Sequence, residues 1–241
     1  MIFIIGLIAV IFLIVVMFYM HRQSDLTILQ LEQAQVEAQF SSLLEERQPI
    51  VIRGVQAPKG LTEEALLKST RLEPLPVKAA LQGTPLTQSE REELAERLSM
   101  TVWANHTWLP MFQEYSWIAP IVGSLKTEAL IGGLGMNRST ALYTCLLPTE
   151  GSYLVSLLSK SSEVFLPAAW ENRIPSSLTS DDTPLVADLK FLDIILSKGN
   201  ALCLPAHLIF SMEPMAGTPC NAAIIEYHEP ISVLAKSLAQ R

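Results

Sequence analysis

Short apolar runs, separated by polar turns, dominate the second half of the chain. The segment Phe191 to Met212 contains two such runs around Ser197-Lys198-Gly199-Asn200, where the glycine can take a positive φ. This pattern predicts two buried β-strands folded about a tight turn. Further β-prone runs predict strands at residues 50–53, 75–81, 152–159, 163–166 and 222–228.

Helix signals are concentrated in the first half. Ser24-Asp25 is a plausible N-cap for a helix running to Glu46, with the first half a stalk and the second half docked on the domain. Thr62 can cap a short helix that ends at Lys68. Thr87 to Glu90 form a capping box ahead of a charged helix to Leu98. Residues 231–241 are expected to form a short terminal helix.

The segment Ile2 to Met20 carries no charge and is apolar on every face. As a helix it would span ~28 Å, which matches the hydrocarbon core of a bilayer. The expected organisation is therefore a transmembrane anchor at 1–22, a stalk or docking helix at 23–47 and a globular domain at 48–241. This makes the chain a single-pass membrane protein whose partner is a lipid bilayer.

The net charge of −7 and the absence of a Lys/Arg cluster argue against nucleic-acid binding. His21 and Arg22 follow the apolar segment and place the large domain in the cytosol by the positive-inside bias. Two glycosylation sequons, at Asn105 and Asn137, point the other way.

The three cysteines are few, odd in number and without CxxC spacing. Cys145, Cys203 and Cys220 all lie in apolar sequence. They therefore suggest neither a disulfide scaffold nor a zinc site, and they favour a reducing compartment.

Three phrases, in order, resemble the cupin-like JmjC family of 2-oxoglutarate oxygenases. The first is a helix followed by the strand Pro49 to Gly54, the second runs from Leu130 to Cys145, and the third is Gly199-Asn200 followed by Pro205. The resemblance covers about residues 34–228. It implies a mainly β fold with flanking helices, a cupin-like double-stranded β-helix or jelly roll, in which the hairpin 194–204 pairs near the strand 141–147.

The resemblance also implies that the iron ligands have been lost. The family's His-x-Asp pair falls on Tyr143 and Cys145, and its second histidine falls on Phe210. Two imidazoles and a carboxylate are what Fe(II) needs, so no catalytic residue, metal or cofactor is expected. Phe210 is expected to fill the interior beside Tyr143.

Other residues near these positions are candidates for a remnant pocket. Thr140 lies in the turn before Tyr143, and Lys160 lies near the place where related enzymes hold 2-oxoglutarate. His207 is a tempting replacement ligand, but an odd spacing from Phe210 puts it on the opposite strand face. A solvated lysine and a polar residue at the rim are the simpler interpretations.

Two functional hypotheses follow. The first is a membrane-anchored pseudoenzyme that acts as a binding or structural module for an unidentified protein partner, for instance in a large virus particle. Its contact surface would be the remnant of the family's active-site pocket or the aromatic segment Trp103 to Trp117. The alternative is an Fe(II)- and 2-oxoglutarate-dependent oxygenase, a hydroxylase or demethylase, with displaced metal ligands.

Overall fold

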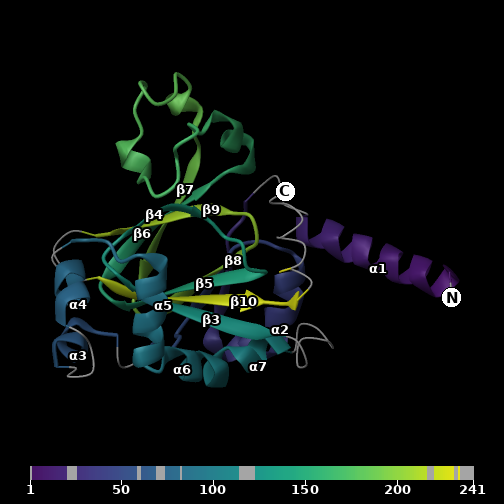
Figure 1. The fold of residues 1–241 in the computed structure, drawn as a ribbon, viewed down its shortest axis with the longest axis horizontal. Coiled ribbons are helices and arrows are strands. Elements are labelled where there is room, and N and C mark those ends of the chain that lie inside the picture. The colour runs from purple at the N-terminus through teal and green to yellow at the C-terminus, as the bar shows by residue number, and fades with distance from the viewer. Residues whose placement is uncertain are drawn as a thin grey trace.

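The computed structural model describes residues 2–20, 26–58, 61–68, 74–81, 83–113, 123–215, 220–230 and 233. Within these residues, two β-sheets face each other, and helices cover the outer face of the larger sheet (Figure 1). The predicted terminal helix at 231–241 lies outside the described residues, apart from residue 233.

The larger sheet has six strands. In spatial order they are β1 (Leu29–Glu32), β2 (Ile50–Arg53), β8 (Asn200–Pro205), β5 (Tyr143–Glu150), β10 (Asn221–His228) and β3 (Ser124–Ile131). The smaller sheet has four strands, in the order β4 (Leu134–Arg138), β9 (Ile209–Pro214), β6 (Ser152–Leu158) and β7 (Phe191–Ser197).

The connections between the sheets are those of a jelly roll. From β3 to β10 the chain passes repeatedly from one sheet to the other, and β3 pairs with β10, β4 with β9, β5 with β8 and β6 with β7, all antiparallel. Eight strands arranged in this nested order define the jelly roll, the fold of cupins. The prediction of a mainly β domain with flanking helices is therefore confirmed, and its strand order is that of a jelly roll.

The alternation of side chains along each strand divides the buried apolar residues of the described chain into clusters on opposite faces of the sheets. Side chains such as Leu146, Phe210 and Ile224 fill the space between the two sheets. Side chains such as Tyr143, Ile225 and Phe112 fill the space between the larger sheet and the helices.

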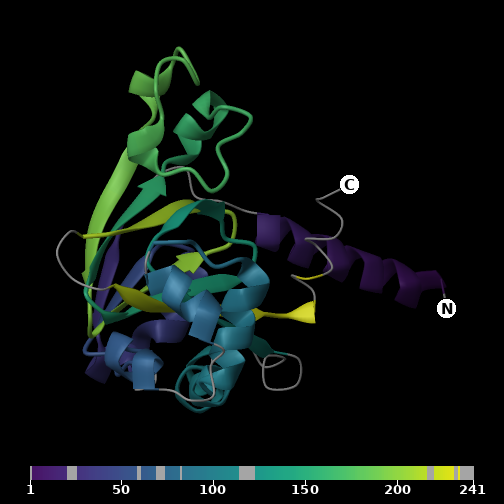
Figure 2. The same cartoon turned by 60° about the vertical axis from the view of Figure 1, so that its left-hand side comes forward.

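The helices pack on the outer face of the larger sheet or close its β3 edge (Figures 1 and 2). They are α2 (Gln33–Glu45), α3 (Glu63–Lys68), α4 (Pro74–Leu81), α5 (Gln88–Arg97), α6 (Met100–Thr107) and α7 (Leu109–Gln113). The Thr87 side chain accepts from the Glu90 backbone and the Glu90 side chain from the Thr87 backbone, so the predicted capping box of α5 is confirmed. Thr62 caps α3 through the backbone N–H of Ala65, as expected.

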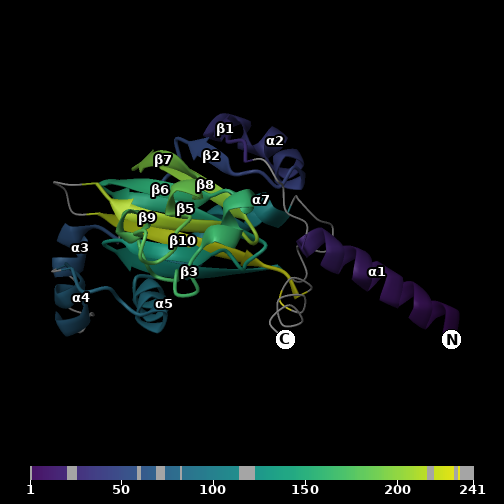
Figure 3. The same ribbon diagram turned by 90° about the horizontal axis from the view of Figure 1, so that it is seen from above.

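Helix α1 (Ile2–Met20) projects away from the jelly roll (Figures 1 and 3). Its last turn packs against the domain: Tyr19 is 2% exposed, and its hydroxyl donates to the backbone oxygen of Thr140 at 2.6 Å. The ring of Tyr19 lies 4.8 Å from that of His207.

No helix within the described residues is long and apolar enough to cross a bilayer. The membrane anchor predicted at Ile2 to Met20 is therefore wrong, as are the single-pass topology and the cytosolic placement deduced from it. The apolar character of the sequence could not reveal that the end of this helix is used for packing against the protein itself.

Several local predictions also need correction. The predicted hairpin at 191–204 is not a hairpin: β7 pairs with β6 in the smaller sheet, whereas β8 pairs with β5 and β2 in the larger one. β7 is also largely half-exposed rather than buried. Gly199 does take a positive φ of 88°, as predicted, but at a crossing between sheets.

The remaining differences concern element type. The helix predicted from Ser24 begins only at Gln33, because Leu29–Glu32 forms β1, parallel to β2. The predicted strand at 75–81 is α4, and the predicted strand at 163–166 lies in a 3₁₀ helix, Lys160–Phe165. The aromatic segment Trp103 to Trp117 covers the second half of α6 and all of α7, and its residues 114–117 lie outside the described residues.

Candidate functional site

A cavity of about 180 Å³ opens at one end of the jelly roll, between the two sheets. We call it the interior cavity. It is bordered by β3, β5 and β10 of the larger sheet, by β4 and β9 of the smaller sheet, and by α5 at the β3 edge. Further along, the space between the sheets is filled mainly by apolar side chains, among them several leucines and Met212.

Two glutamates form the acidic wall of the interior cavity. Glu128 on β3 and Glu226 on β10 face the same side of the sheet as Ile224, which is the register partner of Glu128. Glu128 is 4% exposed, whereas Glu226 is half-buried and lies 3.2 Å from the Nε2 atom of His228. The wall therefore carries two carboxylates in a region of restricted solvent access.

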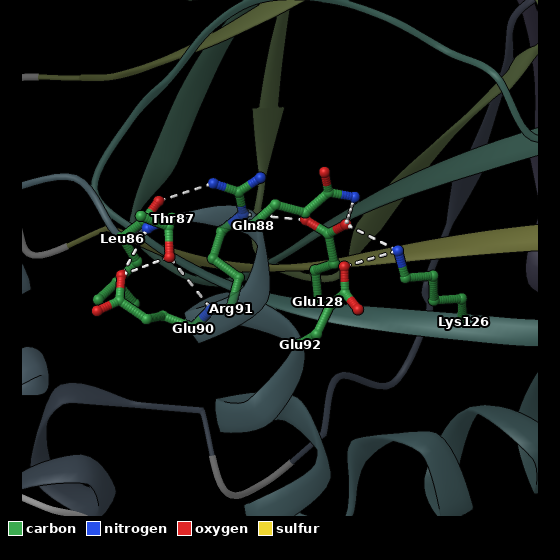
Figure 4. A network of polar contacts seen from close by, with 8 residues as sticks. All are labelled: Leu86, Thr87, Gln88, Glu90, Arg91, Glu92, Lys126 and Glu128. Atoms are coloured by element: carbon green, nitrogen blue, oxygen red, sulfur yellow. Dashed lines mark hydrogen bonds and ion pairs between the residues drawn. The ribbon is translucent and has the colours of Figure 1, made fainter.

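Two side chains of helix α5, Arg91 and Gln88, bind the carboxylate of Glu128 (Figure 4). The Nε atom of Arg91 lies 2.9 Å from Oε2 of Glu128, and the Nε2 atom of Gln88 donates to Oε1 at 3.1 Å. Arg91 also donates to the backbone oxygen of Leu86 at 2.9 Å, which fixes its guanidinium. The capping box places Gln88 and Arg91 in the first turn of α5, facing the sheet edge.

Burial raises the pKa of Glu128, because a carboxylate is poorly solvated at this depth. The charge of Arg91 and its hydrogen bond act in the opposite direction, and the negative charge of Glu226 adds to the rise. Burial is the largest of these effects, so the ion pair offsets it only in part.

The opposite wall is formed by the end of β4. Asn137, Arg138, Ser139 and Thr140 line the interior cavity in succession. The Ser139 hydroxyl donates to the Pro205 backbone oxygen at 2.7 Å and accepts from the Leu208 backbone at 3.1 Å, so it fastens the end of β4 to the β8–β9 connection. Arg138 pairs with Glu163 and lies over the ring of Trp170.

Thr144 on β5 brings to the interior cavity a buried hydroxyl that has no hydrogen-bond partner among the described residues. It lines the interior cavity and is 1% exposed, and its Oγ1 atom has no partner within the described part of the chain. A buried hydroxyl without a partner is costly, and such groups are rare. This atom marks the cavity as a place where a ligand could complete the hydrogen bonding.

The three positions predicted as former metal ligands do not come together. Tyr143 and Cys145 lie on β5 and belong to the core beneath the helices, whereas Phe210 lies on β9 and belongs to the core between the sheets. The hydroxyl of Tyr143 donates to the backbone oxygen of Leu44, and its ring stacks on Phe112. The expectation that Phe210 packs beside Tyr143 is wrong, because the two side chains lie on opposite faces of the larger sheet.

Cys145 forms a disulfide with Cys203. The two residues are register partners on β5 and β8, so the pairing predicted for the hairpin 194–204 holds for its second strand. The sequence had suggested no disulfide, because the two cysteines are 58 residues apart and only the strand pairing brings them together. A disulfide-bonded Cys145 is not a metal ligand.

Of the other three candidates, Thr140 contributes to the interior cavity, whereas His207 and Lys160 do not. Phe210 and Thr140 line it, and Asn137 is the register partner of Phe210. His207 is in a turn with φ of 69° and contacts Tyr19, and Lys160 is exposed at the start of its 3₁₀ helix; neither lines the cavity.

The donor set does not fit an Fe(II) site of the kind that the resemblance implies. The interior cavity offers two carboxylates and no imidazole. In the described part of the chain, no three His, Cys, Asp or Glu side chains are grouped so that they could hold a metal ion. A 2-oxoglutarate dianion would also meet the charges of Glu128 and Glu226.

Sequence reasoning missed Glu128, Glu226, Thr144 and the Asn137 to Ser139 wall. The resemblance placed two ligand positions on β5, in the larger sheet. The third position, Phe210, lies on β9 in the smaller sheet, where β4 is its neighbour. A glutamate next to an apolar β-prone run, as in residues 126–131 and 222–228, was the available signal.

No family model matches this sequence, and no curated protein matches it. Among solved structures, the chain is similar to the non-heme alpha-ketoglutarate-dependent epimerase SnoN from nogalamycin biosynthesis. The similarity has a TM-score of 0.45 and 9% identity, over 81% of this chain and 84% of that chain. At this level the similarity carries no weight, and the fold assignment rests on the strand order.

Proposed function

We propose that this chain is a non-catalytic binding module of jelly-roll fold, which takes a small neutral polar molecule in the interior cavity. The observation that carries the proposal is the buried Thr144 hydroxyl, which lines the cavity and has no partner within the described residues. Its donor and acceptor capacities both suit a ligand hydroxyl.

The charges around the cavity favour a neutral ligand. Two arginines, Arg91 and Arg138, and two glutamates, Glu128 and Glu226, line it. Arg91 and Arg138 are each already paired with a glutamate, and Glu226 lies beside His228. A charged ligand would disturb these pairs, whereas a polyol can exchange hydrogen bonds with carboxylate, guanidinium, amide and hydroxyl groups at once.

The cavity volume limits the ligand. About 180 Å³ corresponds to roughly six water molecules at ~30 Å³ each, which is room for one small organic molecule. Phe210 and Leu134 add an apolar side, against which the carbon skeleton of a ring polyol could lie.

The test is calorimetric titration of the full chain with myo-inositol, with succinate as the charged comparison. We expect saturable binding of myo-inositol, weaker binding of succinate, and a loss of affinity in Thr144→Val of roughly threefold to tenfold, the value of one hydrogen bond. Thr127→Val is the matched control, because Thr127 lies on β3 but faces the helices, where it bonds to Thr101. Equal affinities in the wild type and Thr144→Val would contradict the proposal.

The alternative, an oxygenase related to the JmjC family, is decided by a separate measurement. The full chain, purified without chelator, is analysed for iron and assayed for succinate production from 2-oxoglutarate. Stoichiometric iron with turnover would replace the binding module by an enzyme. Absence of turnover together with polyol binding is the outcome that we expect.

A further inference from the structure

A second cavity, of about 280 Å³, lies on the other face of the larger sheet. We call it the outer cavity. It is formed by the start of α2, the end of β2 with the residues after it, and the junction of α6 and α7. It is separated from the interior cavity by the sheet itself, since Ile52 belongs to the core beneath the helices.

The inner surface of the outer cavity is apolar and its rim is polar. Val36, Ile52 and Val55 are buried, at 4%, 0% and 8% exposure. Gln33 and His106 are exposed at the opening. A cavity of ~150 Å³ with apolar walls is enough to hold benzene, so this one has room for a compact ring with a substituent.

Trp108 supplies the polar contact inside the outer cavity. It lines the cavity and is 1% exposed, and its indole Nε1 has no hydrogen-bond partner among the described residues. Indole Nε1–H is a donor only, and a buried donor of this kind usually finds an acceptor. The missing counterpart is therefore an acceptor atom, not a donor.

The same residues distinguish a neutral acceptor from a charged one. No lysine or arginine is among the described residues that line the outer cavity. A carboxylate would be desolvated there with no cation to balance it, whereas a carbonyl oxygen needs only the indole N–H. The apolar inner walls, the buried Trp108 donor and the lack of a lysine or arginine among the described lining residues together define the chemistry of the ligand.

We propose that the outer cavity binds a compact, uncharged apolar molecule that carries a carbonyl oxygen, which accepts a hydrogen bond from Trp108. This site is independent of the polyol site in the interior cavity. The two cavities differ in chemistry because one lies among charged groups at the mouth of the jelly roll and the other lies in the apolar layer under the helices.

The probes are cyclohexanone and methylenecyclohexane, which share a six-membered ring and differ in having an oxygen or a CH₂ group at the exocyclic position. Each is titrated into the ¹⁵N-labelled full chain, and the indole N–H resonances are followed. The resonance absent from Trp108→Phe identifies Trp108. We expect cyclohexanone to shift it saturably in the direction of stronger hydrogen bonding, and methylenecyclohexane to bind roughly threefold to tenfold more weakly.

Three variants complete the test, with ligand-observed NMR as the readout where the Trp108 signal is lost. Trp108→Phe keeps an aromatic ring but loses the donor, and should bind the two probes equally. Val55→Leu narrows the cavity without changing a polar group, and should weaken both probes. Val102→Ala, at a position 58% exposed on α6, should leave both affinities unchanged.

The proposal is overturned if the wild-type chain binds the two probes equally, if neither probe binds saturably, or if Trp108→Phe keeps the preference for cyclohexanone. Should Trp108→Phe fail to fold, the preference of the wild type and the loss in Val55→Leu decide the question without it.

Discussion

At the scale of single residues, two threonines on the larger sheet should respond in opposite ways to the same substitution. Thr127 bonds to Thr101 at 2.7 Å, whereas the Oγ1 atom of Thr144 has no partner within the described residues. In the absence of ligand, Thr127→Val should lower the free energy of unfolding by about 1 kcal/mol, and Thr144→Val should leave it unchanged or raise it, because a buried unpaired hydroxyl is removed. Urea denaturation of both variants measures this, and a larger loss in Thr144→Val would mean that the hydroxyl is already bonded.

Glu128 gives a prediction about pH at the same scale. Burial raises its pKa in the folded state, so the folded state binds its proton more tightly than the unfolded state does. The stability that Glu128 contributes is therefore complete below the ordinary glutamate pKa of about 4.3 and is lost as the pH rises through the raised value. In Glu128→Gln, the free energy of unfolding should not fall as the pH rises from the ordinary glutamate pKa to the raised pKa of Glu128. Parallel slopes for the wild type and the variant over that range would show that the folded-state pKa is not raised.

At the scale of elements, the turn from β7 to β8 depends on the backbone of Gly199. Its φ is 88°, and a Cβ at this position would have no atom within 4 Å, so a side chain there meets backbone strain rather than a clash. Gly199→Val should lower the free energy of unfolding by roughly 1–3 kcal/mol, because β-branched residues tolerate positive φ poorly. Gly199→Asn should lose less, since asparagine visits this region more readily. Equal losses in thermal denaturation would point to a cause other than strain.

At the scale of the whole molecule, the disulfide ties β5 to β8 across a separation of 58 residues. Such a link restricts the unfolded chain, and disulfides of this kind typically contribute about 2–4 kcal/mol. The double variant Cys145→Ala/Cys203→Ala should lose about that much in denaturant unfolding and should no longer respond to reductant. Cys220→Ala, at the cysteine outside this disulfide, is the control and should keep the response to reductant. A wild-type chain whose stability is unaffected by full reduction would contradict this prediction.

The parts of the fold that could be predicted are those decided by neighbours in sequence. The capping box at Thr87, the strands β2, β6 and β10 and the positive φ of Gly199 each depend on residues a few positions apart. The family resemblance added one pairing, that of residues 194–204 near the strand 141–147, which holds for β8 and β5. Where local signals were ambiguous, as in Leu29–Glu32 and Pro74–Leu81, packing decided the element type, because short apolar runs suit either a strand or a helix.

By itself, the sequence determined a β-rich, acidic domain with flanking helices, because hydrophobic periodicity and capping act over a few residues. Tertiary structure alone decided that β7 and β8 separate into different sheets, that Cys145 meets Cys203, and that the final turn of α1 packs on the domain. It also decided which polar groups converge: Glu128, Thr144 and Glu226 belong to three strands, and one register places all three on the same sheet face. A shift of one residue would turn each side chain to the opposite face, and sequence spacing cannot set that register between distant strands.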